Sequence, residues 1–216
     1  MNVLIIGAGA LGREISKNLR GESNIVIKGF LIKQLIDSSE TIHGFPILGA
    51  DADLGTLVGV HEIEGVFIAI SCPVERRSCF ERLSKNFPHL KYPNYVCGRV
   101  PMTETQSSGK GSIILTNIDF GPNVSIGDFF VAYRGVCIEH DCKIGDFVTL
   151  APGVTLAGGV LIESDVQIYT GVNVIPNISI KKGVNIGAGS LVMKDCDEAS
   201  LYYGMPARLI RTIGRR

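Results

Sequence analysis

The sequence has no excess of charge of either sign. Its 216 residues carry 21 Lys or Arg and 21 Asp or Glu side chains, so the formal net charge at pH 7 is zero. A protein that binds the nucleic acid backbone needs a basic surface that displaces counterions. The balance argues against nucleic acid as a partner, and the length allows one large domain or two smaller ones.

Long apolar runs and a secretory leader are also missing. No stretch approaches the roughly 20 apolar residues that a membrane-spanning helix needs. The apolar start, residues 1–12, lacks the basic segment and the small-residue cleavage site of a signal peptide. The six cysteines contain no C-x-x-C pair, and the length does not suggest a secreted disulfide scaffold. We therefore expect a cytoplasmic protein with mostly reduced cysteines and no membrane partner.

The first 95 residues alternate apolar strands with helices. We predict strands at 2–6, 25–31 and 66–70, and helices near 13–19 and 74–86. This βαβ order predicts a small parallel sheet. Residues 96–111 follow with Pro, Gly and Ser and no clear period, so they form either a connector or an imperfect first coil of the next part.

A glycine turn separates the first predicted strand from the first helix. Gly7, Gly9 and Gly12 form a G-x-G-x-x-G pattern, in which backbone amides and a helix N-terminus can hold phosphate. The ribose-binding acid of an NAD site is missing, because the first acid after the second strand is Asp37. An NAD oxidoreductase is therefore disfavoured, and the glycines alternatively serve only to close a strand–helix turn.

From Ile114 onward the sequence repeats every six residues. Every sixth residue from Ile114 to Val192 is apolar, fourteen in succession, which a 45% apolar background produces about once in a hundred thousand. A second apolar column starts at Ile118. No α-helix has this period, but a short strand pointing in, out and in, followed by a corner rich in Gly, Asp and Asn, does. Stacked coils of this kind form a parallel β-helix.

The hexads at 144–160, the closing segment 186–208 and the HDC at 140–142 resemble the hexapeptide-repeat acyltransferases. With the βαβ half, nearly the whole chain is similar to the bacterial sugar O- and N-acetyltransferases, including sialic acid O-acetyltransferases and bacillosamine-pathway N-acetyltransferases. The resemblance implies an α/β Rossmann-like acceptor-binding domain followed by an all-β left-handed parallel β-helix, arranged as a homotrimer with active sites between chains. The domains expected are 1–95 for acceptor binding, 96–111 as connector, 112–195 as β-helix and 196–216 as C-terminal extension.

The resemblance makes His140 the general base that moves an acetyl group from acetyl-CoA to a sugar amine or hydroxyl by direct attack. Three hexads form one coil in this family, so Gly158, 18 residues on, is the stacked neighbour about 4.8 Å away. Its N–H is the proposed oxyanion donor. The family usually has an acid directly after the histidine, so Asp141 is preferred over Glu139 for orienting the ring. The simpler interpretation is that His140 is a polar corner residue.

Four positions match the family's acetyl-CoA contacts, in a groove between two β-helices: Thr149, Gly158, Thr170 and Ala188. Thr149 stands where the family more often has a second histidine. Tight corners tolerate Gly and Ala in any case, so turn geometry is the alternative explanation for them. Cys142 falls on an inward column and is expected in the core, not as a nucleophile.

The resemblance also implies that the first half binds the acceptor, often a nucleotide-linked sugar, through Gly7, Gly9, Ala10, Leu11 and Lys33. Leu11 replaces a histidine that is common in the family. Lys33 and the residue before it replace an Asp pair that contacts uracil and ribose in UDP-sugar relatives. These departures favour a different nucleotide or a free sugar.

Two other classes of function remain to be weighed against an acyltransferase. A β-helix that holds zinc needs three converging histidines, but only His140 lies within the hexads, so no metal is expected. A non-catalytic scaffold or ligand-binding protein could keep the same solenoid. Binding of acetyl-CoA separates that alternative from the enzyme.

Overall fold

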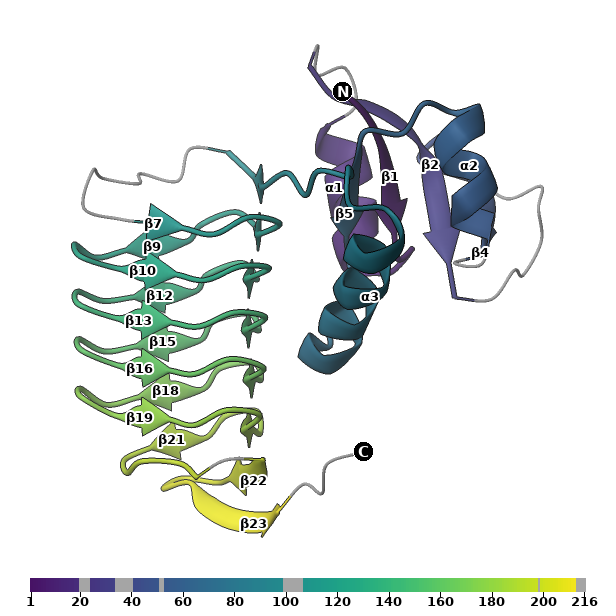
Figure 1. The fold of residues 1–216 in the computed structure, drawn as a ribbon. Helices are drawn as coiled ribbons and strands as arrows, with labels where there is room; N and C mark the ends of the chain where they lie inside the picture. The colour runs from purple at the N-terminus through teal and green to yellow at the C-terminus, as the bar shows by residue number, and fades with distance from the viewer. Residues whose placement is uncertain (20–23, 34–40, 51–52, 99–106, 198, 213–216) are drawn as a thin grey trace. The chain divides into compact units, whose positions relative to one another are not determined.

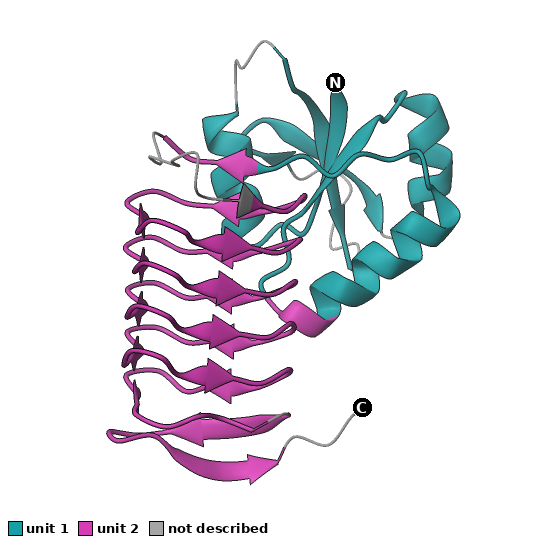
Figure 2. Cartoon of the chain, turned by 60° about the vertical axis from the view of Figure 1, so that its left-hand side comes forward, with its two compact units in different colours: residues 1–71, 75–94 teal, residues 72–74, 95–216 magenta. Residues whose placement is uncertain are grey.

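The computed structural model describes residues 1–19, 24–33, 41–50, 53–98, 107–197 and 199–212. The chain divides into two compact units, one of residues 1–71 and 75–94 and the other of residues 72–74 and 95–216 (Figure 2). The four-part division into acceptor domain, connector, β-helix and C-terminal extension is finer than this and stays a prediction. Residues 99–106 of the predicted connector lie outside the described residues.

The first unit is an α/β fold around one sheet with the strand order β3-β4-β2-β1-β5 (Figure 1). Among its described strands, all pairings are parallel except the β3–β4 hairpin. The elements are β1 (Asn2–Ile6), α1 (Ala10–Asn18), β2 (Val26–Ile32), β3 (Thr41–Ile42), β4 (Phe45–Ala50), α2 (Leu54–Val60), β5 (Gly65–Ile68) and α3 (Pro73–Asn86).

The predicted strands and helices of the first half are present, and the three predicted strands pair in parallel as expected. β1 is buried on both faces from Val3 to Ile6, which explains its unbroken apolar run. The β3–β4 hairpin and α2 were not predicted. Two glycines inside α2 lower its helix propensity, and β3 has only two residues, so neither α2 nor the hairpin has a strong sequence pattern.

The glycine turn joins β1 to α1 by close backbone packing. Gly7 has a φ of 104°, and its N–H donates to the Leu31 carbonyl at 2.9 Å. A Cβ atom at Gly7 would lie 2.7 Å from the carbonyl oxygen of Ala69, so both the backbone conformation and the space require glycine. Gly9 is the N-cap residue of α1, and Leu11 and Ile15 on the next turns are buried.

The second unit is a parallel β-helix whose three sheets form the faces of a prism (Figure 1). Face 1 contains β7 (Ser107–Ser108), β10 (Ser125–Ile126), β13 (Lys143–Ile144), β16 (Leu161–Ile162) and β19 (Ser179–Ile180). Face 2 contains β6 (Tyr95–Val96), β8 (Ile113–Ile114), β11 (Val131–Ala132), β14 (Thr149–Leu150), β17 (Gln167–Ile168), β20 (Asn185–Ile186), β22 (Ser200–Tyr203) and β23 (Arg208–Thr212). Face 3 contains β9 (Asp119–Phe120), β12 (Cys137–Ile138), β15 (Thr155–Leu156), β18 (Asn173–Val174) and β21 (Leu191–Val192).

The two apolar columns of the sequence form the core of the prism. Every residue of the column that starts at Ile114 and of the column that starts at Ile118 is buried. In each hexad the chain points in, out and in, as at Val124, Ser125 and Ile126. Strands pair with partners 18 residues away, for example Ser125 with Lys143. The predicted β-helix, with three hexads to each coil, is therefore confirmed.

Both ends of the β-helix differ from the regular coils. β6 pairs with β8 and β7 pairs with β10, so the flanks of the predicted connector belong to a first, imperfect coil. At the other end β22 continues face 2, and β23 turns back antiparallel to it. Among the described residues, no helix combines the length and the apolar character that crossing a bilayer requires.

Candidate active site

His140 lies at the corner that leads from face 3 to face 1, two residues after the end of β12. The corner is tight because its third residue, Asp141, has a left-handed φ of 59°, a conformation that Asp tolerates better than most residues. Nδ1 of His140 lies 2.8 Å from Oδ2 of Asp141. Both side chains are more than half exposed, at 59% and 56%, so the pair is at the surface and open to a ligand.

The ring of His140 lies against the backbone of Gly158 in the next coil. A Cβ atom at Gly158 would lie 2.5 Å from both Cε1 and Nε2 of the ring, so a side chain at this position would displace the imidazole. In the described part of the chain, the Gly158 N–H makes no backbone hydrogen bond, whereas the next N–H, of Gly159, donates to the His140 carbonyl at 2.9 Å. The Gly158 N–H is thus available to a ligand beside the ring.

The same corner position in the neighbouring coils explains why that N–H is spare. Pro122 lies one coil before His140, and Pro176 lies one coil after Gly158. Proline has no N–H, so the coil does not need a hydrogen bond donor at this position. Gly158 therefore keeps a donor that the fold itself does not use.

Hydrogen bonds keep Asp141 ionised. The hydrogen bond with His140 is the main cause of a lowered pKa of the Asp141 carboxyl, and a second bond, from Nδ2 of Asn123 to Oδ1 at 3.0 Å, lowers the pKa further. An ionised carboxylate only accepts hydrogen bonds, so Nδ1 of His140 must carry the proton that it donates. In the neutral ring Nε2 is then free to accept a proton.

The contacts of the residues next to His140 show which of them touches its ring. Asp141 contacts the ring, whereas a carboxylate oxygen of Glu139 lies 4.0 Å from the sulfur of Cys137. Cys142 is fully buried, and burial raises the pKa of its thiol, which donates to the Ala157 carbonyl at 3.3 Å. Cys142 is therefore a protonated core residue, as its place on the inward column predicted.

The remaining residues predicted to contact acetyl-CoA lie elsewhere on the prism. Thr149 is on β14 of face 2, and its side chain is fully buried. Thr170 and Ala188 lie at the corner between face 2 and face 3, one coil apart, where the Gly189 N–H donates to the Thr170 carbonyl at 2.9 Å. One chain therefore brings Gly158 to His140 but leaves the other three away from it, Thr149 buried on face 2 and Thr170 and Ala188 at another corner, and their cofactor roles stay predictions.

A cavity of about 530 Å³ in the first unit brings together part of the predicted acceptor site. Gly7, Gly9 and Lys33 line it. Ala10 begins α1 and Leu11 is buried beneath the helix, and neither lines the cavity. The assignment of these five residues to acceptor binding stays a prediction.

Sequence reasoning missed two side chains with basic groups that also line this cavity, Arg13 and His43. His43 is at the tip of the β3–β4 hairpin with a φ of 50°, and its Nδ1 lies 3.0 Å from Oγ of the buried Ser16. Arg13 follows Gly12 in the glycine motif, so its position in the sequence could have drawn attention to it. His43 could not be found without the unpredicted hairpin. Lys33 pairs with Glu75 at 3.4 Å.

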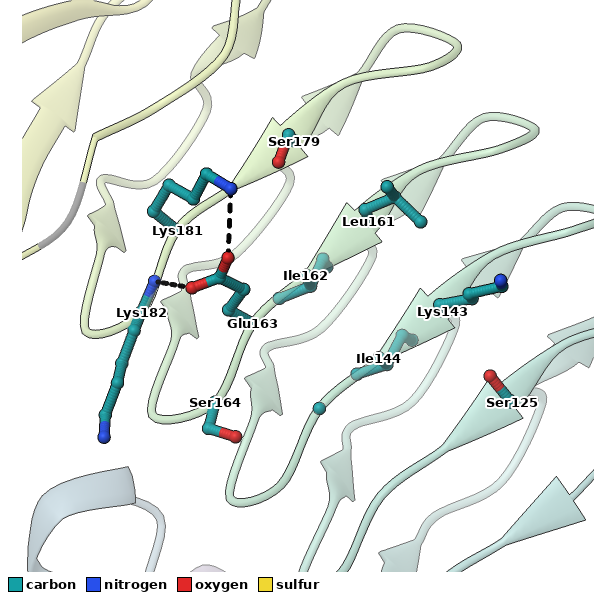
Figure 3. Close-up of a pocket in the computed structure, with 11 residues that line it drawn as sticks. Ser125, Lys143, Ile144, Leu161, Ile162, Glu163, Ser164, Ser179, Lys181 and Lys182 are labelled. Carbon is teal, nitrogen blue, oxygen red and sulfur yellow. Dashed lines mark hydrogen bonds and ion pairs between the residues drawn. The ribbon is translucent and has the colours of Figure 1, made fainter.

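A second hollow, of about 510 Å³, lies on face 1 (Figure 3). Lys143 and Leu161 point outward from its strands, and Glu163 at its edge accepts from Nζ of Lys181 at 3.0 Å and from the N–H of Lys182 at 3.1 Å. It contains none of the predicted site residues. Within the described residues, no group of three or more His, Cys, Asp or Glu side chains is arranged to hold a metal ion.

Comparison with known proteins finds sugar acetyltransferases that are similar to this chain in sequence or in fold. No family model matches the chain. A GDP-perosamine N-acetyltransferase of Escherichia coli O157:H7 is 39% identical over 64 residues, which is 30% of this chain and 27% of that protein. The sequence match thus spans about a quarter of the curated relative.

Solved structures match over nearly the whole length. PerB from Caulobacter crescentus, solved with CoA and GDP-perosamine, has a TM-score of 0.85 at 25% identity, with 97% of each chain covered. WeeI from Acinetobacter baumannii AYE has a TM-score of 0.76 at 25% identity, over 97% of this chain and all of that one. The acetyltransferase domain of PglB from Neisseria gonorrhoeae FA1090, solved with acetyl coenzyme A, shares the fold with a TM-score of 0.81 at 24% identity, over 97% and 98% of the two chains. These likenesses agree with the resemblance that the repeat and its histidine indicated: the chain is similar to hexapeptide-repeat sugar N-acetyltransferases.

Proposed function

We propose that the protein is an acyltransferase that moves an acetyl group from acetyl-CoA to the amino group of a nucleotide-linked sugar. The observation that carries the proposal is the group formed by His140, Asp141 and Gly158. It combines a base whose proton is held on Nδ1 with a neighbouring N–H that the fold leaves unused. Acyl transfer from a thioester requires these two functions close together.

The chemistry follows from the two groups. Nε2 of His140 takes a proton from the sugar amine as its nitrogen attacks the thioester carbonyl carbon. The Gly158 N–H donates to the carbonyl oxygen as it gains negative charge, and Asp141 stabilises the imidazolium. When the C–S bond breaks, the imidazolium returns the proton to the departing sulfur, which leaves an acetamide and CoA. Direct attack is favoured because Cys142, the thiol next in the chain, is buried.

The groove for acetyl-CoA is proposed to form between two copies of the chain in a homotrimer. Thr149, Thr170 and Ala188 are the other predicted contacts, and they are not beside His140 in one chain. A neighbouring copy could bring its corner between face 2 and face 3 to the His140 corner. Exposed Leu161 and Tyr169, at 45% and 46%, are the kind of apolar side chains that self-association would cover.

The acceptor is proposed to bind in the first unit, in the cavity at the glycine turn. Lys33, Arg13 and His43 line it, and none of the lining residues that the structure describes is an acid. This lining suits an anion such as a sugar diphosphate. Gly7 and Gly9 allow close approach of the backbone, and the predicted roles of Ala10 and Leu11 belong to this proposal.

The names of the relatives suggest the acceptor class. The curated relative is called a GDP-perosamine N-acetyltransferase, and PerB was solved with GDP-perosamine. We carry over from them a nucleotide-linked amino sugar as the acceptor and N-acetylation as the reaction. Lys33 stands where UDP-sugar relatives are expected to carry an acid, which favours a nucleotide other than UDP.

The proposal includes finer features of the fold and setting. The β-helix is taken as left-handed and the first unit as Rossmann-like, with strands β4-β2-β1-β5 in the order of a half dinucleotide fold. Residues 1–95 would bind the acceptor and residues 112–195 would carry out acetylation, with 96–111 connecting them and 196–216 closing the end. Because acetyl-CoA is an intracellular metabolite, the enzyme is placed in the cytoplasm, in polysaccharide biosynthesis.

The test is release of free CoA thiol against a panel of nucleotide-linked amino and hydroxy sugars, with and without the nucleotide. The proposal expects thiol release with at least one nucleotide-linked amino sugar and loss of that activity in a His140→Ala variant. Full activity in the variant would refute the role of His140. If no acceptor releases thiol and acetyl-CoA does not stabilise the protein, the non-catalytic scaffold replaces the enzyme.

A further inference from the structure

Asn123 lies one coil before Asp141 at the same corner position and contacts its carboxylate. Nδ2 of Asn123 donates to Oδ1 of Asp141 at 3.0 Å, and Oδ2 of Asp141 lies 2.8 Å from Nδ1 of His140. The three side chains therefore form one series of hydrogen bonds across two coils. Each carboxylate oxygen of Asp141 has a different partner, so hydrogen bonds orient the carboxylate at both ends.

The backbone makes this contact possible. Asn123 and Asp141 have the same left-handed φ, 59°, which aligns their side chains one above the other along the prism. The next coil carries Gly159 at this position, which has no side chain to offer to Asp141. Of the residues at this corner position in the coils on either side of Asp141, Asn123 is therefore the one whose side chain can hold the Asp141 carboxylate.

We propose that Asn123 is a positioning residue for the acetyl transfer, acting through Asp141 on His140. This inference rests on the proposed function. By fixing the carboxylate, Asn123 keeps the imidazole proton on Nδ1 and leaves Nε2 as the base. An asparagine suits this role because its amide donates to an ionised carboxylate without adding a charge.

The need for such a residue follows from exposure. The side chain of Asp141 is 56% exposed. Without a second partner, the Asp141 side chain would rotate to other rotamers, and its carboxylate would bind water in place of His140. Each alternative rotamer leaves the ring without its orienting acceptor. A hydrogen bond to a charged group typically changes an equilibrium by about tenfold, and we expect a loss of that size in kcat.

Asn123→Gly is the informative variant, and Asn177→Gly is its matched control. Glycine adopts a φ of 59° without strain, so the corner is preserved while the amide is lost. Asn177 has the same φ two coils beyond Asp141, and its Oδ1 lies beside Gly159. We expect kcat about tenfold lower in N123G with unchanged KM for both substrates, and values like those of the unmodified protein in N177G.

The pH profile separates positioning from a structural role. In Asn123→Asp a second carboxylate faces Asp141, and its negative charge favours the imidazolium form of His140. The acidic limb of the kcat profile should therefore move to higher pH in N123D and stay in place in N177D. A merely structural effect would lower the whole curve without moving it.

A double variant tests whether Asn123 acts through Asp141. Once Asp141→Asn has removed the ionised acceptor, adding N123G should cost little more, because the two residues work as one unit. Additive losses, an N123G enzyme as fast as N177G, or an unmoved acidic limb in N123D would each overturn the inference. An unmodified protein that releases no CoA would instead overturn the proposed function on which the inference rests.

Discussion

At the scale of single residues, the proposed chemistry depends on what neighbouring coils leave out as much as on what they supply. His140 finds space for its ring because Gly158 has no side chain, and it finds a spare donor because the coil does not use the N–H there. Asp141 orients the ring from the same coil. The backbone repeat thus places the base His140, the carboxylate of Asp141 and the N–H of Gly158 together with few side chains. This is possible because the spacing between β-rungs matches the distance needed between the base and the hydrogen bond donor.

Gly158→Ala tests the space beside the ring. The new Cβ would lie 2.5 Å from Cε1 and Nε2 of His140, so the imidazole must rotate away. We expect kcat to fall by about 10² or more, because the base is displaced. The melting temperature should change little, since the ring is exposed and can move. Gly59→Ala, at a site where a Cβ meets no atom within 4 Å, is the control. A G158A enzyme with full activity would contradict the assigned geometry.

Asp141→Asn tests the ionised carboxylate through the pH dependence of stability. Hydrogen bonds hold the folded-state pKa of Asp141 below its ordinary 3.8. A lowered folded pKa contributes stability that is present above 3.8 and disappears as the pH falls through the lower folded value. The unmodified protein should therefore be slightly more stable than D141N in urea at neutral pH. That difference should vanish in strong acid, and a difference that grew on acidification would refute the hydrogen bonds.

At the scale of elements, each coil needs a left-handed residue at its corners, and the protein does not always use glycine there. Phe129 and Phe147 take this position between face 1 and face 2 with φ values of 55° and 56°. Their rings stack with centroids 4.9 Å apart and 13° between planes, and both are buried. Stacking of large apolar rings on successive coils offsets the strain of a left-handed backbone.

Substitutions at Phe147 should reverse the usual order of alanine and glycine. Phe147→Ala removes the stacked ring and keeps the strain, so we expect a loss of about 3 kcal/mol or more in the free energy of unfolding. Phe147→Gly removes the ring but relieves the strain, so it should be about 1 kcal/mol less destabilising than F147A. Urea denaturation measures both.

Val148 provides the matched comparison, since it is buried next to Phe147 and has no left-handed φ. There V148G should be less stable than V148A, in the usual order. If F147A also proved more stable than F147G, strain at this corner would not contribute significantly to the free energy of unfolding.

At the scale of the whole molecule, the chain contains two units, and the predicted site residues are divided between them and lie at several separate places in each. The His140 corner belongs to one unit and the acceptor cavity to the other. Thr170 and Ala188 lie at a different corner of the prism from His140. A closed ring of identical subunits would supply the missing contacts by symmetry, since a heterologous interface joins two different corners.

A homotrimer predicts a particle of about three times the 23.2 kDa chain. Light scattering coupled to size exclusion measures this mass, without reference to shape. We expect the mass of a trimer at micromolar concentration, and we expect charge reversal of an interface corner to lower both the mass and kcat. A stable, active monomer would show that the site does not need a second chain.

Acetyl-CoA binding should stabilise the native protein whether or not it turns over. At about 100 times its Kd, a ligand that binds only the folded state adds about 2.7 kcal/mol, which raises the melting temperature by several degrees. His140→Ala should keep this shift while turnover falls by about 10² to 10⁴, because the base is not needed for binding. CoA serves as the positive control and adenosine as the negative one. Loss of the shift in H140A would mean that His140 binds the cofactor instead of acting as base.

The β-helix and the stacking of Gly158 on His140 could be predicted from the sequence because the repeat ties chain position to spatial position. A period of six, with 18 residues to the coil, leads from His140 to Gly158 and from Asp141 back to Asn123. Asn123 was therefore within reach of the same rule, but an asparagine at a corner usually indicates only a turn. The departures at Leu11 and Thr149 are also clear in the sequence, and both side chains are buried.

What the sequence determined by itself is the stacked order of the β-helix, because neighbours in a solenoid are set by a constant spacing and a buried apolar column. Only the tertiary structure decided that Asp141, rather than Glu139, contacts the ring, and that the Gly158 N–H is spare. It also decided that His43 joins the glycine-turn cavity. These features depend on side-chain rotamers and on pairing between strands far apart in the chain, and no local pattern of residues specifies either of them.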